Sequence, residues 1–153
     1  MQRNDRTHEL VDFCKEVATL ANSNSRQYYI GSGFSIDFSL GELTRDHEDV
    51  DLVIAASDVE WWKHEFTKRG YSISAYDYMH YFPGAFTVCH PSAKPHDSSD
   101  FIAEVWPMVF RDDGTLVPPH TADHPGREWW RGKNWHKLKR VVYEDVPMVI
   151  EGP

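Results

Sequence analysis

The chain has 153 residues, of which 41% are hydrophobic and 14% aromatic, so it can bury a core and we expect a single domain over residues 1–153. Its net charge of −8 argues against non-specific nucleic-acid binding, which needs a basic surface, and nucleic acid is therefore a disfavoured partner. No apolar run approaches the roughly 18 residues of a membrane span, and the N-terminus lacks an apolar signal region, so we expect no membrane partner.

The first predicted element is an amphipathic helix over residues 7–22, where apolar residues recur at helical spacing. Core packing is its expected use, and Cys14 on its apolar face is expected to be a buried thiol. Cys14 and Cys89 form no metal or disulfide pattern, which predicts a reducing, cytoplasmic location.

A short strand at residues 27–30 then runs into a turn made of Gly31, Ser32 and Gly33. Glycine permits a positive φ and close backbone approach, and residues 34–40 suit a short helix. A strand, a glycine-rich turn and a helix N-terminus present backbone N–H groups to an anion. This stretch is therefore the predicted phosphate site.

The next strand carries Asp49 and Asp51 with one residue between them. Successive side chains of a strand point to opposite faces, so the two carboxylates share a face, roughly 7 Å apart at Cβ. The intervening apolar residues, Val50 and Leu52, point into the core. Paired carboxylates repel each other unless a cation lies between them, and Mg²⁺ suits oxygen ligands of this kind.

Ser57 and Glu60 match a capping box, which predicts a helix running to a stop at Gly70. Strands are expected at residues 71–76, 78–82 and 86–90, followed by a polar loop over residues 90–99. Later strands are expected at residues 100–110, 141–143 and 146–150, with a hairpin turn at Asp113-Gly114.

Glu104 lies in the middle of the strand at residues 100–110, on the face that it shares with Ile102 and Trp106. Charged residues are seldom buried unless they are paired. Either this face is exposed, or Glu104 has a cation or a hydrogen-bond donor as its partner.

The only basic stretch surrounds Trp129, Trp130 and Trp135, which are interleaved with lysine and arginine residues at 127–140. It supplies either counter-charge and an aromatic platform for a nucleotide, or a solvated face with its tryptophans in the core.

Taken in order, these segments resemble the small antibiotic nucleotidyltransferases, the lincosamide and aminoglycoside adenylyltransferases of the polymerase-β-type superfamily. The resemblance rests on the glycine turn, on the segment from Arg45 to Asp51, and on the strand bearing Glu104. It also includes the hairpin at residues 112–114 and the closing strand at residues 146–150. The family usually has Gly-Gly-Trp in place of Ser32-Gly33-Phe34 and Asp in place of Glu104.

The resemblance implies an α/β (α+β) nucleotidyltransferase fold, a mixed β-sheet with helices packed on it. It implies transfer of a nucleoside monophosphate, AMP from ATP by default, to a hydroxyl of a small molecule such as a lincosamide or an aminoglycoside. Asp49 and Asp51 would hold Mg²⁺, with two ions in the active complex, and Glu104 would bind metal or take the acceptor proton. Gly31, Ser32, Gly33 and Arg45 would bind the nucleotide.

Some roles stay open at this stage. Arg45 contacts phosphate or clamps Asp37 or Glu48. His47 orients a carboxylate or packs beneath the loop, whereas Asp37 is expected to fix the loop. A protein or tRNA acceptor and a non-catalytic nucleotide-binding or partner-binding relative are the alternatives in function. Relatives commonly continue into further helices where this chain stops at Pro153. We therefore expect either a minimal catalytic domain or a site completed by a partner, such as a second copy in a homodimer.

Overall fold

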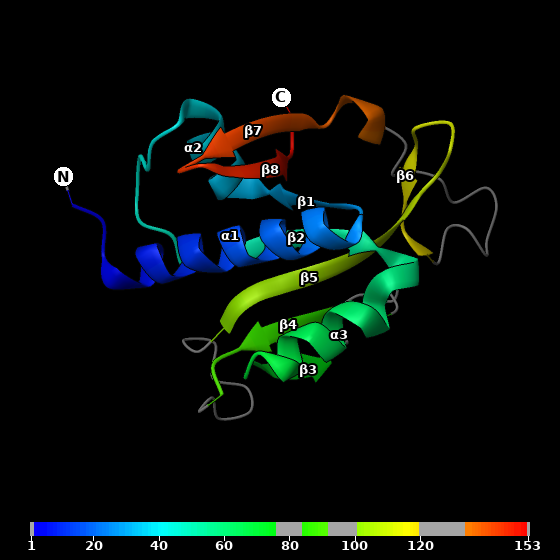
Figure 1. The fold of residues 1–153 in the computed structure, drawn as a ribbon, viewed down its shortest axis with the longest axis horizontal. Coiled ribbons are helices and arrows are strands. Elements are labelled where there is room, and N and C mark those ends of the chain that lie inside the picture. Colours follow the sequence, from blue (N-terminus) through cyan, green and yellow to red (C-terminus); the bar gives the residue numbers. More distant parts are fainter. Residues whose placement is uncertain (1, 76–83, 92–100, 120–133, 153) are drawn as a thin grey trace.

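The computed structural model describes residues 2–75, 84–91, 101–119 and 134–152, which form one mixed sheet with α-helices packed on it (Figure 1). The predicted fold class is confirmed. The helices are α1 (Asp5–Asn24), α2 (Ser32–Leu40) and α3 (Val59–Lys68). The strands are β1 (Tyr28–Gly31), β2 (Val50–Ala55), β3 (Ser72–Ala75), β4 (Phe86–Cys89), β5 (Phe101–Phe110), β6 (Leu116–Val117), β7 (Lys139–Tyr143) and β8 (Val146–Ile150).

Strand β2 lies in the interior of the sheet, between β1 and β5. The order along the sheet is β3-β4-β5-β2-β1-β8-β7, and β6 pairs with β5. Strand β2 runs parallel to β5 and antiparallel to β1. Strand β2, which follows Asp49, therefore has β1 with its glycine turn on one side and β5 with Glu104 on the other.

The two faces of the sheet are buried by different parts of the chain. Val50, Leu52 and Ile54 of β2 lie in the large core that also contains apolar residues of all three helices. Val53 lies in a smaller core on the other face, where Trp135 packs beside Phe110. The alternation predicted for β2 is thus confirmed, and Asp51 belongs to the face opposite the helices. Figure 1 shows α1 crossing the sheet and α3 beside β3 and β4.

The helix starts agree only partly with the sequence signals. Helix α1 is capped by Asn4, whose side chain accepts a hydrogen bond from the Thr7 N–H at 2.8 Å. The capping box predicted at Ser57 is wrong, because residues 56–58 form a 3-10 turn and α3 begins one residue later with Asp58 at the cap position. The Asp58 carboxylate is bound by Arg26 at 2.8 Å.

Two strand details also differ from expectation. Asp49 precedes the first residue of β2, so the acidic pair straddles the strand start. Ile102 packs in the helix-side core and does not share the face of Glu104, because the register between β4 and β5 shifts at Cys89, where Phe101 is the paired residue. Such a bulge re-aims the side chains around it.

The remaining elements match their signals where they fall in the described residues. The Asp113-Gly114 turn joins β5 to β6, and the turn at Glu144 and Asp145 joins β7 to β8 with positive φ at both residues. Trp135 is half-buried and packs against the smaller core, and its indole N–H donates to the Arg111 carbonyl at 2.5 Å. The strand expected at residues 78–82, most of the loop at 90–99, and Trp129 and Trp130 lie outside the described residues.

Both cysteines are free and buried, as predicted for Cys14. In the described part of the chain, no helix combines the length and the apolar character needed to cross a membrane.

Candidate active site

The turn between β1 and α2 is tight, because Ser32, the residue directly after β1, is already the first residue of α2. Gly31 is extended at the helix cap, and Ser32 follows with φ at 53°, in the left-handed region that non-glycine residues seldom adopt. The exposed Ser32 side chain lies at the start of a helix of nine residues. The predicted strand, turn and helix are all present at this position.

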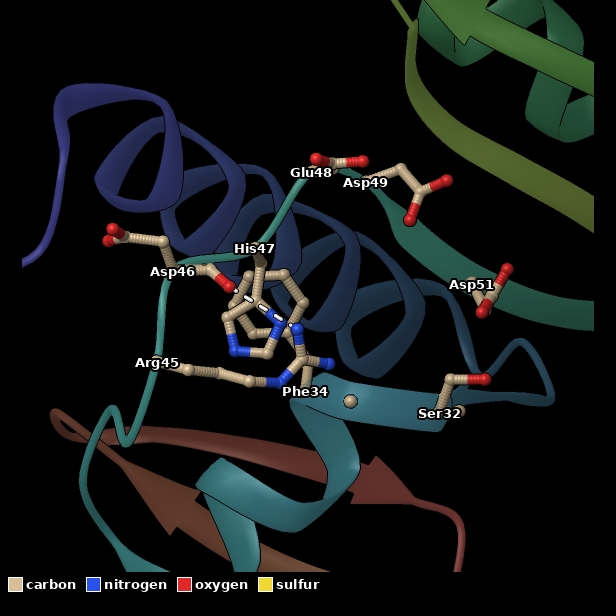
Figure 2. A pocket seen from close by; sticks show the side chains of 10 residues that line it. Ser32, Phe34, Arg45, Asp46, His47, Glu48, Asp49 and Asp51 are labelled. Atoms are coloured by element: carbon tan, nitrogen blue, oxygen red, sulfur yellow. Dashed lines mark hydrogen bonds between the residues drawn. The ribbon is translucent and has the colours of Figure 1, made fainter.

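Gly33 is required by close packing. A Cβ atom there would collide with the Arg45 guanidinium and would lie 3.1 Å from the His47 ring. Because Gly33 has no side chain, the Arg45 side chain lies across the turn, close to the N-terminus of α2 (Figure 2).

A carboxylate of the chain itself already contacts this turn. The Ser32 N–H donates to Oε2 of Glu151 at 3.2 Å, and the Glu151 N–H donates to the Ile30 carbonyl at 2.9 Å. Glu151 comes directly after β8, which runs parallel to β1. The backbone N–H of the predicted phosphate site is thus capable of binding an anion, because it binds this one.

The predicted acidic residues come together across three strands. Asp51 pairs in register with Gly31 of β1 on one side and with Glu104 of β5 on the other. Paired residues of neighbouring strands point to the same face, so Asp51 and Glu104 lie side by side. Figure 2 shows Asp49, Asp51 and Ser32 following one another along one edge of the pocket.

The charges of these carboxylates act on one another. Partial burial, followed by the charges of Asp51 and Glu48, raises the pKa of Asp49 above its ordinary value. Burial, followed by the charges of Asp51 and Asp49, likewise raises the pKa of Glu104. The three groups thus form one electrostatic unit that would gain from a cation.

The donor set fits a hard cation, although not as a finished three-ligand cage. In the ranges that the structure covers, no group of three or more His, Cys, Asp or Glu side chains is arranged to hold a metal ion. Mg²⁺ characteristically uses one or two protein carboxylates and takes its other ligands from phosphate and water. Asp49 and Asp51 fit that requirement, and the metal-ligand assignment of all three carboxylates stays a prediction.

The loop that leads to Asp49 is fixed by a buried pair. His47 Nε2 lies 2.7 Å from Oδ2 of Asp37, and both side chains are at most 3% exposed. The Thr44 hydroxyl donates to the other Asp37 oxygen at 2.5 Å, and the His47 ring stacks on Phe34 at 3.9 Å between centroids. Asp37 and His47 therefore hold the loop in place, and His47 both packs beneath the loop and pairs with a carboxylate.

Arg45 forms neither of the two ion pairs considered from the sequence, with Asp37 or with Glu48. Its guanidinium donates to the Asp46 carbonyl at 3.3 Å and lies over Gly33, and the described residues include no ion pair from it to Asp37 or Glu48. The side chain lines a pocket of about 300 Å³ together with the glycine turn and the acidic pair.

A second pocket adjoins the first. Its volume is about 600 Å³, and it shares residues 46–49 with the first pocket. It is also lined by Glu104 from β5 and by Arg6 from the first turn of α1. One pocket thus contains the predicted phosphate turn, the other contains Glu104, and Asp49 borders both.

Sequence reasoning missed two residues of this region, Arg6 and Glu151. Arg6 precedes the helix predicted at residues 7–22, and Glu151 follows the closing strand predicted at residues 146–150, so neither was given a role. Neither has a local sequence signal, because each reaches the site through contacts between segments far apart in the chain.

A mixed sheet in which a glycine turn, an acidic strand start and a third carboxylate meet is the arrangement of a nucleotidyltransferase, an enzyme that takes its transferred group from a nucleotide donor. The family model described as aminoglycoside-2''-adenylyltransferase matches residues 14–150. The chain belongs to this family of antibiotic adenylyltransferases, which confirms the resemblance found from its motifs.

Solved structures agree in fold. The crystal structure of the lincosamide antibiotic adenylyltransferase LnuA, bound to lincomycin, has a TM-score of 0.68 at 17% identity, over 97% of this chain and 82% of that chain. The solution structure of the antibiotic-resistance factor ANT(2'')-Ia has a TM-score of 0.59 at 17% identity, over 95% of this chain and 66% of that chain. The crystal structure of ANT(2'')-Ia with adenylyl-2''-tobramycin has a TM-score of 0.57 at 16% identity, over 95% and 70% respectively. No curated protein sequence matches the chain.

Replacing Gly33 tests the close packing at the turn. Gly33→Ala is expected to displace Arg45 and to weaken nucleotide binding about tenfold, or about 1.4 kcal/mol, measured by isothermal titration calorimetry. Gly152→Ala is the matched control, because its Cβ would meet only the Lys137 carbonyl at 3.5 Å. Equal affinities of the two variants would contradict a role for this packing.

Removing Asp37 tests the buried pair. Burial alone would raise the pKa of the Asp37 carboxyl, but hydrogen bonds from Thr44 and His47 outweigh it and hold the pKa below its ordinary value. Its stabilisation is therefore present above about pH 3.9 and is lost as the pH falls through the lowered pKa. Asp37→Ala should lower the free energy of unfolding at pH 7 by about 3–5 kcal/mol in urea titrations. A loss no larger than that of Asp112→Ala in the exposed hairpin would contradict this.

Proposed function

We propose that the chain transfers the adenylyl group of ATP, with Mg²⁺, to a hydroxyl group of an aminoglycoside or a related antibiotic. The observation that carries the proposal is the pairing of Asp51 with Glu104 across β2 and β5, with Asp49 and the Ser32 turn beside them. The acceptor class is supported by the family description and by relatives solved with lincomycin and with adenylyl-2''-tobramycin.

Asp49 and Asp51 would hold the magnesium, which supplies positive charge to the phosphate oxygens during transfer. The backbone at Gly31–Gly33 and the Ser32 hydroxyl would bind the β- and γ-phosphates, and the Arg45 guanidinium over Gly33 would add a permanent positive charge. Together these groups would position the α-phosphate near Glu104, in the second pocket.

Glu104 would take the proton of the acceptor hydroxyl. The hydroxyl oxygen bonds to the α-phosphorus, the bond from phosphorus to the bridging oxygen breaks, and pyrophosphate leaves with that electron pair. A raised pKa suits a carboxylate to this task, because a base works best when its pKa approaches the working pH. The extra methylene of Glu, compared with the usual Asp, extends this base toward the acceptor.

The second pocket, which contains Glu104 and would hold the acceptor, favours a cationic substrate. Asp46, Glu48, Asp49 and Glu104 line it and outnumber Arg6, so its field attracts amines. Aminoglycosides are polyamines with free hydroxyl groups, which makes them the acceptors that this charge suits best.

The experiment is a turnover screen that measures Mg²⁺-dependent release of pyrophosphate from ATP with individual aminoglycosides and lincosamides. Transfer should require the metal and the acceptor together, and mass spectrometry should find an acceptor heavier by one adenylyl group. Asp49→Asn and Asp51→Asn should each lower turnover at least about 1,000-fold while leaving the fold intact.

Asp112→Asn, in the exposed hairpin, is the matched control and should turn over like the wild type. Near-normal turnover of Asp49→Asn or Asp51→Asn would overturn the assignment of the metal ligands. Nucleotide binding without transfer to any acceptor would favour a non-catalytic relative.

Glu104→Gln separates catalysis from stability. It should slow transfer more than it weakens nucleotide binding, because the base is lost and the phosphate site is kept. It should also raise the melting temperature at pH 7 without metal. Burial and the charges of Asp51 and Asp49 raise the pKa of Glu104, so this group favours the folded state at low pH and destabilises it once the pH has passed the raised pKa. A variant that is less stable than the wild type at pH 7 would contradict this.

A further inference from the structure

Arg6 lies in the first turn of α1, a position that does not favour an arginine. The N-terminus of a helix carries partial positive charge, so a cation there is mildly destabilising. The compensation must come from contacts outside the helix, and the structure supplies them at the candidate active site.

The Arg6 guanidinium binds the segment just before β2 and the first residue of β5 at the same time. Its Nε donates to the Glu48 carbonyl at 2.8 Å, and its Nη2 donates to the Phe101 carbonyl at 2.8 Å. Nη2 also donates to the Glu48 carbonyl at 2.5 Å. One planar group thereby joins the segments that lead to Asp49 and to Glu104.

These two carbonyls belong to the register of the sheet. The first pair of the β2–β5 ladder joins Val50 to Ala103, and Glu48 and Phe101 each lie two residues before that pair. The guanidinium therefore extends the parallel ladder beyond its first pair. It acts at the end of the ladder where the acidic residues lie, since Asp51 and Glu104 form the next pair along.

The neighbours of Arg6 anchor the same loop. The Asn4 N–H donates to the Asp46 carboxylate at 2.9 Å, and the His47 N–H donates to the Thr7 hydroxyl at 2.8 Å. The start of α1 thus binds residues 46, 47 and 48 in succession. Arg6 adds the connection from this loop to β5.

We propose that Arg6 is a positioning residue for adenylyl transfer, fixing the separation between the Asp49–Asp51 pair and Glu104 by binding the Glu48 and Phe101 carbonyls. The inference rests on the proposed function. Arginine suits this task better than lysine, because its rigid fork directs several N–H groups in one plane. Transfer depends on such separations, because a displacement of about 1 Å can cost about 100-fold in rate.

The test compares Arg6→Ala and Arg6→Lys with the wild type. Arg6→Ala should lower kcat about 100-fold with little change in the KM for ATP or acceptor. Arg6→Lys should fall between Arg6→Ala and the wild type, and added guanidinium ion should partly restore the turnover of Arg6→Ala.

Arg26→Ala is the matched control. Arg26 also makes contacts between distant segments, with Asp58 at 2.8 Å and over the Trp61 ring at 4.4 Å, but away from the acidic residues. This variant should lose stability and keep the wild-type kcat. A wild-type kcat in Arg6→Ala, or a rise in KM alone, would overturn the proposal, because the second result would mean direct contact with substrate.

Hydrogen exchange makes the test independent of turnover. In both Arg6 variants the amides of residues 48–52 and 101–105 should exchange faster than in the wild type, whereas α3 should be unchanged. If the wild type transfers nothing, the proposed function fails, and unchanged exchange at these two segments would separately overturn the bridging role of Arg6.

Discussion

The parallel pairing of β2 with β5 is the constraint on which the candidate site depends. It brings Asp51 and Glu104, 53 positions apart in the chain, to one level on one face of the sheet. Strand β1 on the other side of β2 brings the glycine turn to the same level through the pairing of Gly31 with Asp51. The glycine turn, the acidic pair and the third carboxylate are therefore placed by backbone hydrogen bonds, which tolerate little sliding because a slip of one residue would reverse every side chain.

This arrangement costs stability. Partial burial of the carboxyl groups, followed by repulsion from the neighbouring carboxylates, raises the pKa of Asp49 and of Glu104. The surrounding structure offsets the cost with apolar and paired groups. Val50 and Leu52 are fully buried on the opposite face, and Asp37 and His47 fix the loop from below. Sites that are strained by their own charge in this way are typical of enzymes that bind metal and phosphate.

Much of the fold follows from local patterns. Alternation placed Leu52 in the core and Asp51 on the other face, and the Asp113-Gly114 signal located a hairpin. The glycine turn followed from Gly31 and Gly33. Other features depend on tertiary contacts that no local pattern encodes. Arg6 and Glu151 reach the site from 42 and 119 positions away, and the bulge that moves Ile102 arises from the register of β4 against β5. The capping motif at Ser57 failed because a 3-10 turn moved the helix start past it.

The contact between Glu151 and the Ser32 N–H has a consequence for affinity. A backbone N–H has one hydrogen to donate, so a phosphate oxygen can take this one only by replacing the tethered carboxylate. If a phosphate binds at this turn as proposed, its binding exchanges one anion for another, and the released Glu151 side chain regains its solvation as the phosphate loses its own. The measured affinity for the phosphate would then reflect only the difference between two similar interactions. This favours weak, readily reversible binding over tight binding.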